Sequence, residues 1–138
     1  MRLLLDTCAV IDLLTDPDNL GKGALGIVSE SSNMLYASFE TMRELIVHFN
    51  NKSLLSKRWK SAQEMIDYVE NDLDIEFLPL RSRVGYTYAN LRLNENENHR
   101  DPSDHIIIAH AIAERITLLS SDSRFWFYRE QGLDLIEY

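Results

Sequence analysis

Short apolar runs alternate with stretches of helical periodicity along the chain. Residues 3–5 form one apolar run, and the apolar positions between residues 10 and 14 recur at the spacing of a helix face. The same pattern predicts strands at residues 3–5, 34–38, 75–80, 116–119 and 133–136. It predicts helices at residues 10–14, 20–30, 39–50, 54–72, 84–93 and 101–112, with a short aromatic helix after residue 122. Strands separated by helices indicate an α/β fold with a mainly parallel sheet.

Nothing in the pattern divides the chain into parts. It has no internal repeat, no low-complexity stretch and no linker rich in glycine or proline. Its 138 residues and 45% hydrophobic content are sufficient for one core. We therefore expect residues 1–138 to form a single domain.

The apolar runs are too short for a membrane protein. None approaches the roughly 20 residues that cross a bilayer, and the amino terminus lacks the pattern of a signal peptide. Cys8 is the only cysteine, which excludes an internal disulfide and a zinc site built on several thiols. These features predict a cytoplasmic protein with no membrane segment.

The charge balance is acidic, with a formal net charge of −8 at pH 7. An acidic surface repels polyphosphate, which argues at first against a nucleic-acid partner. However, arginines outnumber lysines ten to four, which suits bidentate phosphate contacts, and bound divalent cations would offset several charges locally. The composition therefore excludes neither a nucleic acid nor a basic partner protein.

Two acidic residues directly follow predicted strands. Asp6 comes after the run of residues 3–5, and Asp122 follows the strand at residues 116–119. In an open parallel sheet, ligands bind in the crevice outside the carboxyl ends of the strands, so these two side chains are expected to meet there. Each residue has a simpler interpretation, because an Asp after a strand often caps the next helix.

Two further acids lie on predicted helices and are ambiguous by themselves. Asp104 lies in the first turn after Asp101 and Pro102, where the helix dipole alone favours an acid. Glu44 is one turn from both Glu40 and His48, and an exposed helical acid is its simplest interpretation.

Four blocks of the sequence, in order, resemble the PIN-domain nucleases, especially the VapC-type toxins of bacterial toxin–antitoxin pairs. The blocks are residues 3–11, 38–54, 99–111 and 118–128, and together they span nearly the whole chain. The resemblance implies a three-layer α/β/α domain. The chain departs from the family pattern at Ser103, where an aromatic residue is usual, at His105, where Arg is usual, and at His48, where Lys is common. These departures concern the surroundings of the substrate phosphate rather than the acids.

The resemblance also implies a site and an activity. The acidic metal ligands of the family fall on Asp6, Glu44, Asp104 and Asp122, which predicts a site for Mg²⁺ or Mn²⁺. Such hard cations prefer oxygen ligands, activate water and neutralise charge on an attacked phosphate. The implied function is a metal-dependent endoribonuclease that hydrolyses RNA and acts as the toxin of a toxin–antitoxin pair. A cognate antitoxin and a homodimeric state are implied in the same way.

The neighbouring polar residues have more than one possible role. Thr7 and Ser120 are candidates to support the ligands, although either could cap a helix. Asp101 is expected to cap its helix. Three histidines, His99, His105 and His110, raise the question of zinc, but their spacing does not direct them to one side of a helix. A contact of His105 with substrate phosphate remains open.

Two other functions compete with the ribonuclease. One is a phosphohydrolase that uses Asp6 as a covalent nucleophile, as in haloacid-dehalogenase-like enzymes. Those enzymes carry a second Asp two positions later, where this chain has Cys8. The other is a non-catalytic acidic PIN-like module that binds a protein or acts as a scaffold.

Overall fold

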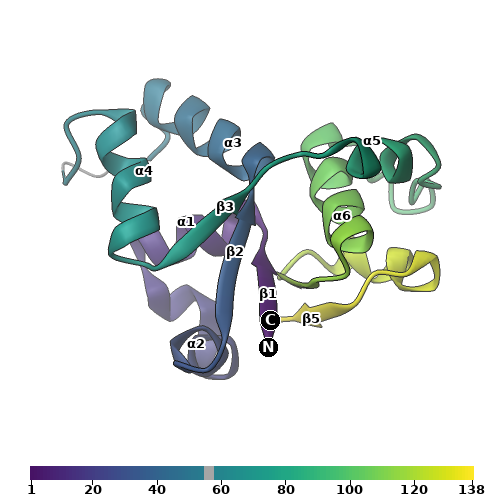
Figure 1. Ribbon diagram of the computed structural model, residues 1–138, viewed down its shortest axis with the longest axis horizontal. Coiled ribbons are helices and arrows are strands. Elements are labelled where there is room, and N and C mark those ends of the chain that lie inside the picture. Colours follow the sequence, from purple (N-terminus) through teal and green to yellow (C-terminus); the bar gives the residue numbers. More distant parts are fainter. Residues whose placement is uncertain (55–57) are drawn as a thin grey trace.

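The computed structural model describes residues 1–54 and 58–138, and it is built around one five-stranded sheet (Figure 1). The strands are β1 Arg2–Leu5, β2 Met34–Ser38, β3 Ile75–Leu78, β4 Thr117–Ser120 and β5 Leu135–Glu137. Their spatial order is β3-β2-β1-β4-β5, and every neighbouring pair runs parallel. The predicted α/β fold with about five parallel strands is therefore confirmed.

Helices connect the strands and cover both faces of the sheet. They are α1 Thr7–Thr15, α2 Gly21–Ser29, α3 Phe39–Asn50, α4 Ala62–Asn71, α5 Ser82–Ala89 and α6 Pro102–Glu114, with 3₁₀ segments η1 Pro17–Leu20 and η2 Ser123–Gln131. Figure 1 shows α1 to α4 on one side of the molecule and α5 and α6 on the other. No helix within residues 1–54 or 58–138 is long and apolar enough to cross a membrane.

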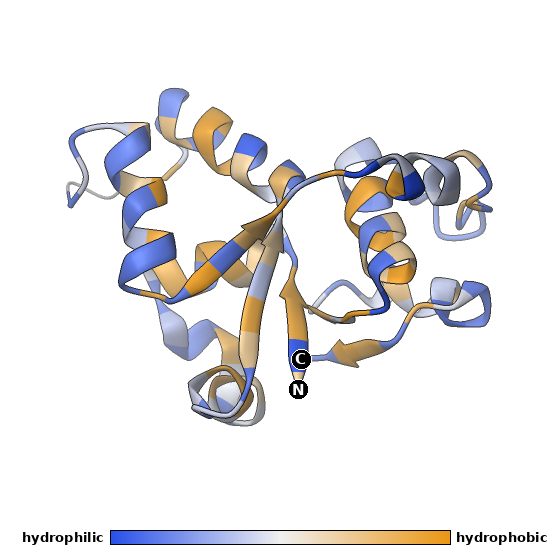
Figure 2. Cartoon of the chain, viewed as in Figure 1, coloured by the Kyte–Doolittle hydropathy of each residue, from blue (hydrophilic) through white to orange (hydrophobic). Residues whose placement is uncertain are grey.

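The three leucines of β1 show how the sheet divides the core into two halves. Successive side chains of a strand point to opposite faces. Leu3 and Leu5 accordingly pack in a cluster with α1, α3 and α4, whereas Leu4 packs with Ile107 and Ile108 of α6. Figure 2 shows the matching hydrophobic colour along the strands and on the inner faces of the helices. The chain is thus a three-layer α/β/α structure, as the resemblance implied.

Several predicted boundaries were wrong. The helix expected at residues 54–72 begins only at Ala62, because the Ser61 side chain caps it by accepting a hydrogen bond from the Glu64 backbone N–H at 3.1 Å. Residues 55–57 of that prediction lie outside the described residues. The strand expected at 75–80 ends at Leu78, directly before Pro79, which has no N–H to continue the ladder.

The C-terminal elements also differ in detail from the prediction. The helix expected at 84–93 occupies Ser82–Ala89, and the last strand is Leu135–Glu137 rather than 133–136. The short aromatic helix after residue 122 is present as a 3₁₀ helix, with Phe125 and Tyr128 buried. None of these shifts moves an acidic candidate off its expected element.

The strand order creates a switch point between β1 and β4. The chain passes from β1 outward through β2 to β3, and then returns to the other side of β1 for β4 and β5. In such sheets the crevice at the switch point, outside the carboxyl ends of the strands, is where ligands bind. Asp6 directly follows β1 and Asp122 lies two residues after β4, so both are at this crevice.

Candidate metal centre

Asp6 lies at the end of β1 and is the N-cap of α1. Its Oδ1 accepts a hydrogen bond from the Ala9 backbone N–H at 2.8 Å, and its Oδ2 accepts one from the Ser120 hydroxyl at 2.5 Å. The side chain is only 4% exposed. Burial, assisted by repulsion from Asp104 and Asp122, raises the pKa of Asp6 to about 7. Asp6 therefore caps a helix and also lies in the acidic crevice.

Asp122 reaches the same crevice from the other side of the switch point. Its backbone N–H donates to the Ser120 hydroxyl oxygen at 3.1 Å, so Ser120 links Asp6 to Asp122. Asp122 caps η2 and forms a two-pronged ion pair with Arg124, at 3.0 and 2.7 Å. Hydrogen bonding to Arg124 lowers the pKa of Asp122 below its usual value, so this carboxylate stays ionised.

Asp104 projects from the first turn of α6, where a histidine holds it. The Nε2 of His99 lies 3.1 Å from Asp104 Oδ2, and the Nδ1 of His99 lies 2.9 Å from the Tyr128 hydroxyl. That hydroxyl accepts a hydrogen bond from the Asn94 backbone N–H at 3.1 Å. An ionised Asp104 carboxylate can only accept hydrogen bonds, so the Nε2–H of His99 donates to it.

Glu44 lies on the α3 side of the acidic crevice. Its Oε1 accepts a hydrogen bond from the Thr7 hydroxyl at 2.5 Å, and Thr7 also lies 3.0 Å from the Thr41 hydroxyl. Burial raises the pKa of Glu44, and repulsion from Asp101, Asp104 and Glu40 adds to the effect. Glu44 is therefore a half-buried acid tied to the residue next to Asp6, rather than an exposed helical acid.

The acids predicted from the sequence converge, though not equally tightly. One ligand atom each from His99, Asp104 and Asp122 lie within 4.8 Å of one another. Asp6 is coupled to this group through repulsion from both aspartates and through Ser120, and Glu44 is coupled through repulsion from Asp104. His99, Asp104 and Asp122 thus lie around one point, and Asp6 and Glu44 lie near enough to interact electrostatically with Asp104.

The position of His99 was not predicted from the sequence. The spacing of the histidines suggested only a zinc site, and it did not support one. In the structure His99 is 1% exposed and lies between Asp104 and Tyr128. Its location five residues before Asp104, in a loop leading into the helix, is the one sequence signal that could have indicated the contact.

The other polar candidates have structural contacts. Asp101 caps α6 by accepting a hydrogen bond from the Ser103 backbone N–H at 2.9 Å, as predicted. His105 is buried, and its Nε2 lies 3.0 Å from the backbone carbonyl of His99, which fixes the loop and leaves the ring unavailable to solvent. Neither residue joins the candidate centre as a ligand, and His105 is not arranged to contact a substrate phosphate.

The donor atoms suit a hard divalent cation. Carboxylate oxygens are the ligands that Mg²⁺ and Mn²⁺ prefer. Burial is the main cause of the raised pKa values of Asp6 and Glu44, and repulsion from neighbouring acids adds to it. A bound cation would lower both pKa values by stabilising the ionised forms. By contrast, both oxygens of Asp6 already accept hydrogen bonds, which is unfavourable for the covalent nucleophile considered above.

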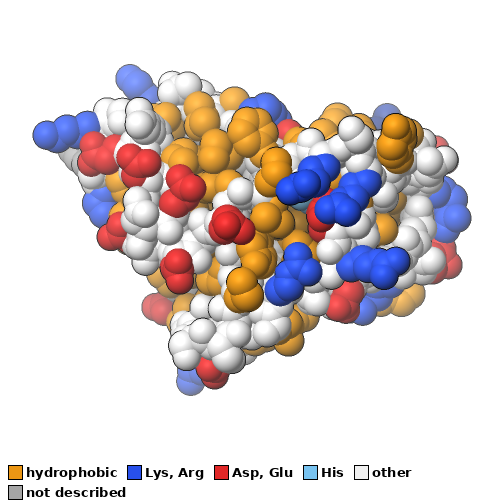
Figure 3. Space-filling model, in the orientation of Figure 1, with side chains coloured by type: hydrophobic (Ala, Val, Ile, Leu, Met, Phe, Trp, Pro, Cys, Tyr) orange, Lys and Arg blue, Asp and Glu red, His pale blue; other side chains and the backbone are white. Residues whose placement is uncertain are grey.

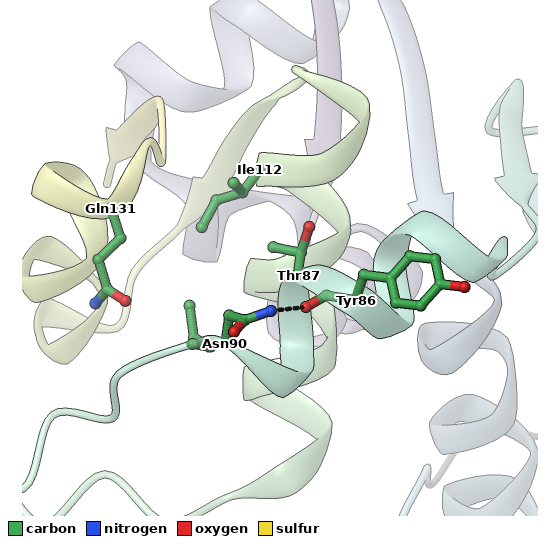
Figure 4. Close-up of a pocket in the computed structure, with 6 residues that line it drawn as sticks. Tyr86, Thr87, Asn90, Ile112 and Gln131 are labelled. Carbon is green, nitrogen blue, oxygen red and sulfur yellow. Dashed lines mark hydrogen bonds between the residues drawn. The ribbon is translucent and has the colours of Figure 1, made fainter.

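A pocket away from the acidic centre offers different chemistry. Its volume is about 490 Å³, and the residues labelled in Figure 4 lie in α5, directly after α5, in α6 and in η2. It is lined by Tyr86, Thr87, Asn90, Leu91, Ile112 and Gln131. None of these side chains is acidic or basic, so the pocket provides no ligand set for a cation and no group to activate water.

Comparisons with solved structures agree with the fold. A chain in the crystal structure of VapBC2 from Rickettsia felis bound to a DNA fragment from their promoter has a TM-score of 0.75 at 22% identity, with 99% of this chain and 98% of that chain covered. VapBC-1 from nontypeable Haemophilus influenzae gives 0.69 at 20% identity, covering 99% and 98%. FitAcB from Neisseria gonorrhoeae gives 0.69 at 20% identity, covering 98% and 96%.

The sequence matches a family model but no individual curated protein. A search of curated proteins gives no significant match. The model of the PIN domain family, however, matches residues 3–129, which is nearly the whole chain and includes all four acids. The resemblance stated from the sequence is confirmed at the level of family and fold: the chain belongs to the PIN domain family.

Proposed function

We propose that this chain is a divalent-metal-dependent endoribonuclease that hydrolyses RNA phosphodiester bonds, with Mg²⁺ or Mn²⁺ held by Asp6, Glu44, Asp104 and Asp122. The observation that carries the proposal is the convergence of these acids at the switch point of the sheet, where two of them have raised pKa values. Membership of the PIN domain family is consistent with this chemistry. Residues 1–138 would act as one domain.

The residues of the centre have separable tasks. A bound cation would polarise the attacked phosphate and lower the pKa of the attacking water. Asp6, Asp104 and Asp122 are the principal ligands, directly or through water, and Glu44 binds a second cation or orients the attacking water from the α3 side. Thr7 fixes Glu44, while Ser120 fixes Asp6. These hydroxyls keep the carboxylate oxygens in one orientation, which a hydrolytic site requires before substrate arrives.

His99 is a positioning residue in this scheme. Its Nε2–H donates to the Asp104 carboxylate, and the Tyr128 hydroxyl contacts the other ring nitrogen. A histidine in this role orients a ligand carboxylate without binding the cation.

The test is RNA cleavage by Asp104→Asn compared with Asp101→Asn. Both substitutions remove one negative charge from the same helix start, but Asn at position 101 retains a capping oxygen. Asp104→Asn is expected to lose cleavage in Mg²⁺ or Mn²⁺ by about 100-fold or more, because a ligand is lost. Asp101→Asn is expected to retain most activity. Circular dichroism and thermal unfolding establish that both variants fold.

Full cleavage by folded Asp104→Asn would refute the proposed centre. Absence of both cleavage and divalent-cation binding in the unsubstituted chain would favour the non-catalytic protein-binding module instead. Calorimetry with Mn²⁺ distinguishes the two cases, since the module requires no cation.

We further propose that the chain is the toxin of a toxin–antitoxin pair, is inhibited by a cognate antitoxin and forms a homodimer in the cytoplasm. Support comes from the structural relatives, which include VapBC complexes and a member of the VapBC family of toxin–antitoxin systems from Mycobacterium tuberculosis. A tagged Asp6→Asn chain purified from its native host should retain a protein that blocks RNA cleavage by the active form. Light scattering tests the dimer.

A further inference from the structure

A small basic pocket lies on the α6 side of the sheet, away from the acidic centre. Its volume is about 250 Å³, and its walls come from β1, β2, β3, α5 and α6. Three arginines, Arg2, Arg81 and Arg83, line it together with Tyr36 and His110. Figure 3 shows several Lys and Arg side chains close together to the right of centre, with both signs of charge present on each half of this face. The pocket itself is lined by three arginines and two glutamates, in a protein whose formal net charge is −8.

His110 is one of the residues that line this pocket, and it has a buried ring nitrogen without a partner among the residues that the structure describes. The residue is 0% exposed, and its Nε2 is a buried side-chain nitrogen with no hydrogen-bond partner among residues 1–54 and 58–138. Its Nδ1 lies 2.8 Å from the Ser38 hydroxyl. Leaving a buried polar atom unpaired destabilises a fold by about 1 to 3 kcal/mol, so such an atom requires an explanation.

The hydrogen bonds of Ser38 determine which proton His110 carries. The Ser38 oxygen accepts a hydrogen bond from the Glu40 backbone N–H at 3.1 Å. Donation of the Ser38 hydroxyl proton to His110 Nδ1 is the arrangement that satisfies this buried hydroxyl. Neutral His110 then carries its proton on Nε2. Burial lowers the pKa of His110, which favours the neutral form. The unpaired atom is therefore an N–H donor that lacks an acceptor.

The three arginines differ in the contacts that they make with other residues of the chain. Arg83 is held by Glu114 through two hydrogen bonds of 2.7 and 2.8 Å. Arg2 stacks over Tyr36, with 5.7 Å between its guanidinium carbon and the ring centroid. Arg81 makes no ion pair with any residue in the described part of the chain. Arg2 and Arg81 are thus the cations with donors to spare, and Glu76 is the remaining acid in the wall.

We propose that this pocket binds a phosphate group, with Arg2 and Arg81 contacting its oxygens and the Nε2–H of His110 donating to it. A phosphate offers several acceptor oxygens and matches the planar fork of arginine. A carboxylate offers only two oxygens for three separate donors. The pocket is large enough for a phosphate and part of a nucleoside but is too small for a folded partner element. The phosphate comes either from a free nucleotide or from an RNA strand.

The pocket is separate from the acidic centre. His110 follows Asp104 by six residues on α6, which places the two about 9 Å apart along the helix axis. The proposal does not depend on RNA cleavage, because it concerns phosphate binding. A failed cleavage experiment therefore leaves it standing, and a failed phosphate-binding experiment leaves the proposed nuclease standing.

The experiment is a binding titration of the full chain in EDTA, which prevents cation-dependent cleavage. The probes are AMP, adenosine and a short single-stranded RNA. AMP or the RNA is expected to bind, and adenosine is not. Arg2→Gln and Arg81→Gln are each expected to weaken binding on the order of tenfold, because each removes a charged donor. Arg92→Gln is the matched control, since Arg92 is an exposed arginine paired with Glu130 outside this pocket.

Each outcome has a defined meaning. Binding of AMP with the same arginine dependence identifies the nucleotide phosphate as sufficient, whereas binding of RNA alone identifies a strand phosphate. Absence of binding by both phosphate probes, or affinities equal in Arg81→Gln, Arg2→Gln and Arg92→Gln, would overturn the proposal. The role of His110 is read from its Nε2–H resonance by NMR, which is expected to shift when the phosphate probe binds. An unchanged resonance removes His110 from the site.

Discussion

Replacing Asp6 with Asn should stabilise the protein in the absence of divalent cations, although it removes a predicted ligand. Asp6 is 4% exposed and lies near Asp104 and Asp122, so its ionised form is unfavourable in the folded state. Asn has nearly the same shape and no charge. Its side-chain oxygen can still accept from the Ala9 N–H, and its amide can donate to the Ser120 oxygen, so both existing contacts have a counterpart.

The size of the effect follows from the pKa of Asp6. Burial raises this pKa from 3.8 to about 7 in the folded chain. Between these values the folded chain retains a proton that the unfolded chain has lost, so the stability of the unsubstituted protein falls as pH rises. The full penalty above the folded pKa is about 4 kcal/mol. From about pH 5 to about pH 7.5 the change amounts to about 2.5 kcal/mol.

The assay is urea unfolding in EDTA at several pH values, followed by fluorescence of the buried Trp59. Other groups also titrate, so the informative quantity is the difference in unfolding free energy between Asp6→Asn and the unsubstituted chain. That difference should grow by about 2.5 kcal/mol in favour of the variant from about pH 5 to about pH 7.5. Added Mn²⁺ should stabilise the unsubstituted chain more than the variant. A difference that does not change with pH, or a less stable variant at pH 7.5, would refute the reasoning.

Three further substitutions test other parts of the structure. His99→Leu should weaken Mn²⁺ binding about 10- to 100-fold, because Asp104 loses its hydrogen-bond donor. His99→Gln can still donate and should retain much of the Mn²⁺ affinity measured by calorimetry. An equal loss of affinity in both variants would contradict the positioning role. Arg124→Gln should tighten Mn²⁺ binding several-fold, since the guanidinium competes for Asp122; weaker binding in the same measurement would argue against that competition. Ile108→Ala should lower the unfolding free energy by about 2 to 5 kcal/mol, because its side chain is fully buried; a loss below about 1 kcal/mol in urea unfolding would contradict its place in the core.

The sequence predicts best the features that depend on residues close to one another in the chain. Residues 3–5 are apolar without alternation because both faces of β1 are covered, as Leu4 and its neighbours show. The acids Asp6 and Asp122 were predicted because strand ends are visible in the pattern and the crevice lies beyond them. The start of α4 was also readable: Ser61 and Glu64 have the spacing of a capping box, but the longer apolar periodicity obscured it.

The contacts made by the loop before α6 were not predictable from periodicity. That loop looks like a polar connection, yet Asn94 is buried and donates to Glu97, to the Arg124 carbonyl and, through its backbone, to Tyr128. These bonds bring His99 against Asp104. They join segments about thirty residues apart. These segments meet because of the order of the strands in the sheet, and that order cannot be predicted from the sequence pattern of one segment.

The hydrogen bond between Ser120 and Asp6 joins positions 114 residues apart, and it has a consequence for the synthesis of the protein. A chain is synthesised from its amino terminus at about 5 to 20 residues per second, so β4 is made on the order of ten seconds after β1. Until then Asp6 has neither Ser120 nor Asp122 beside it. An enzyme that cleaves RNA, as proposed for this chain, would therefore gain its complete centre only after the residues of β4 and Asp122 have been synthesised.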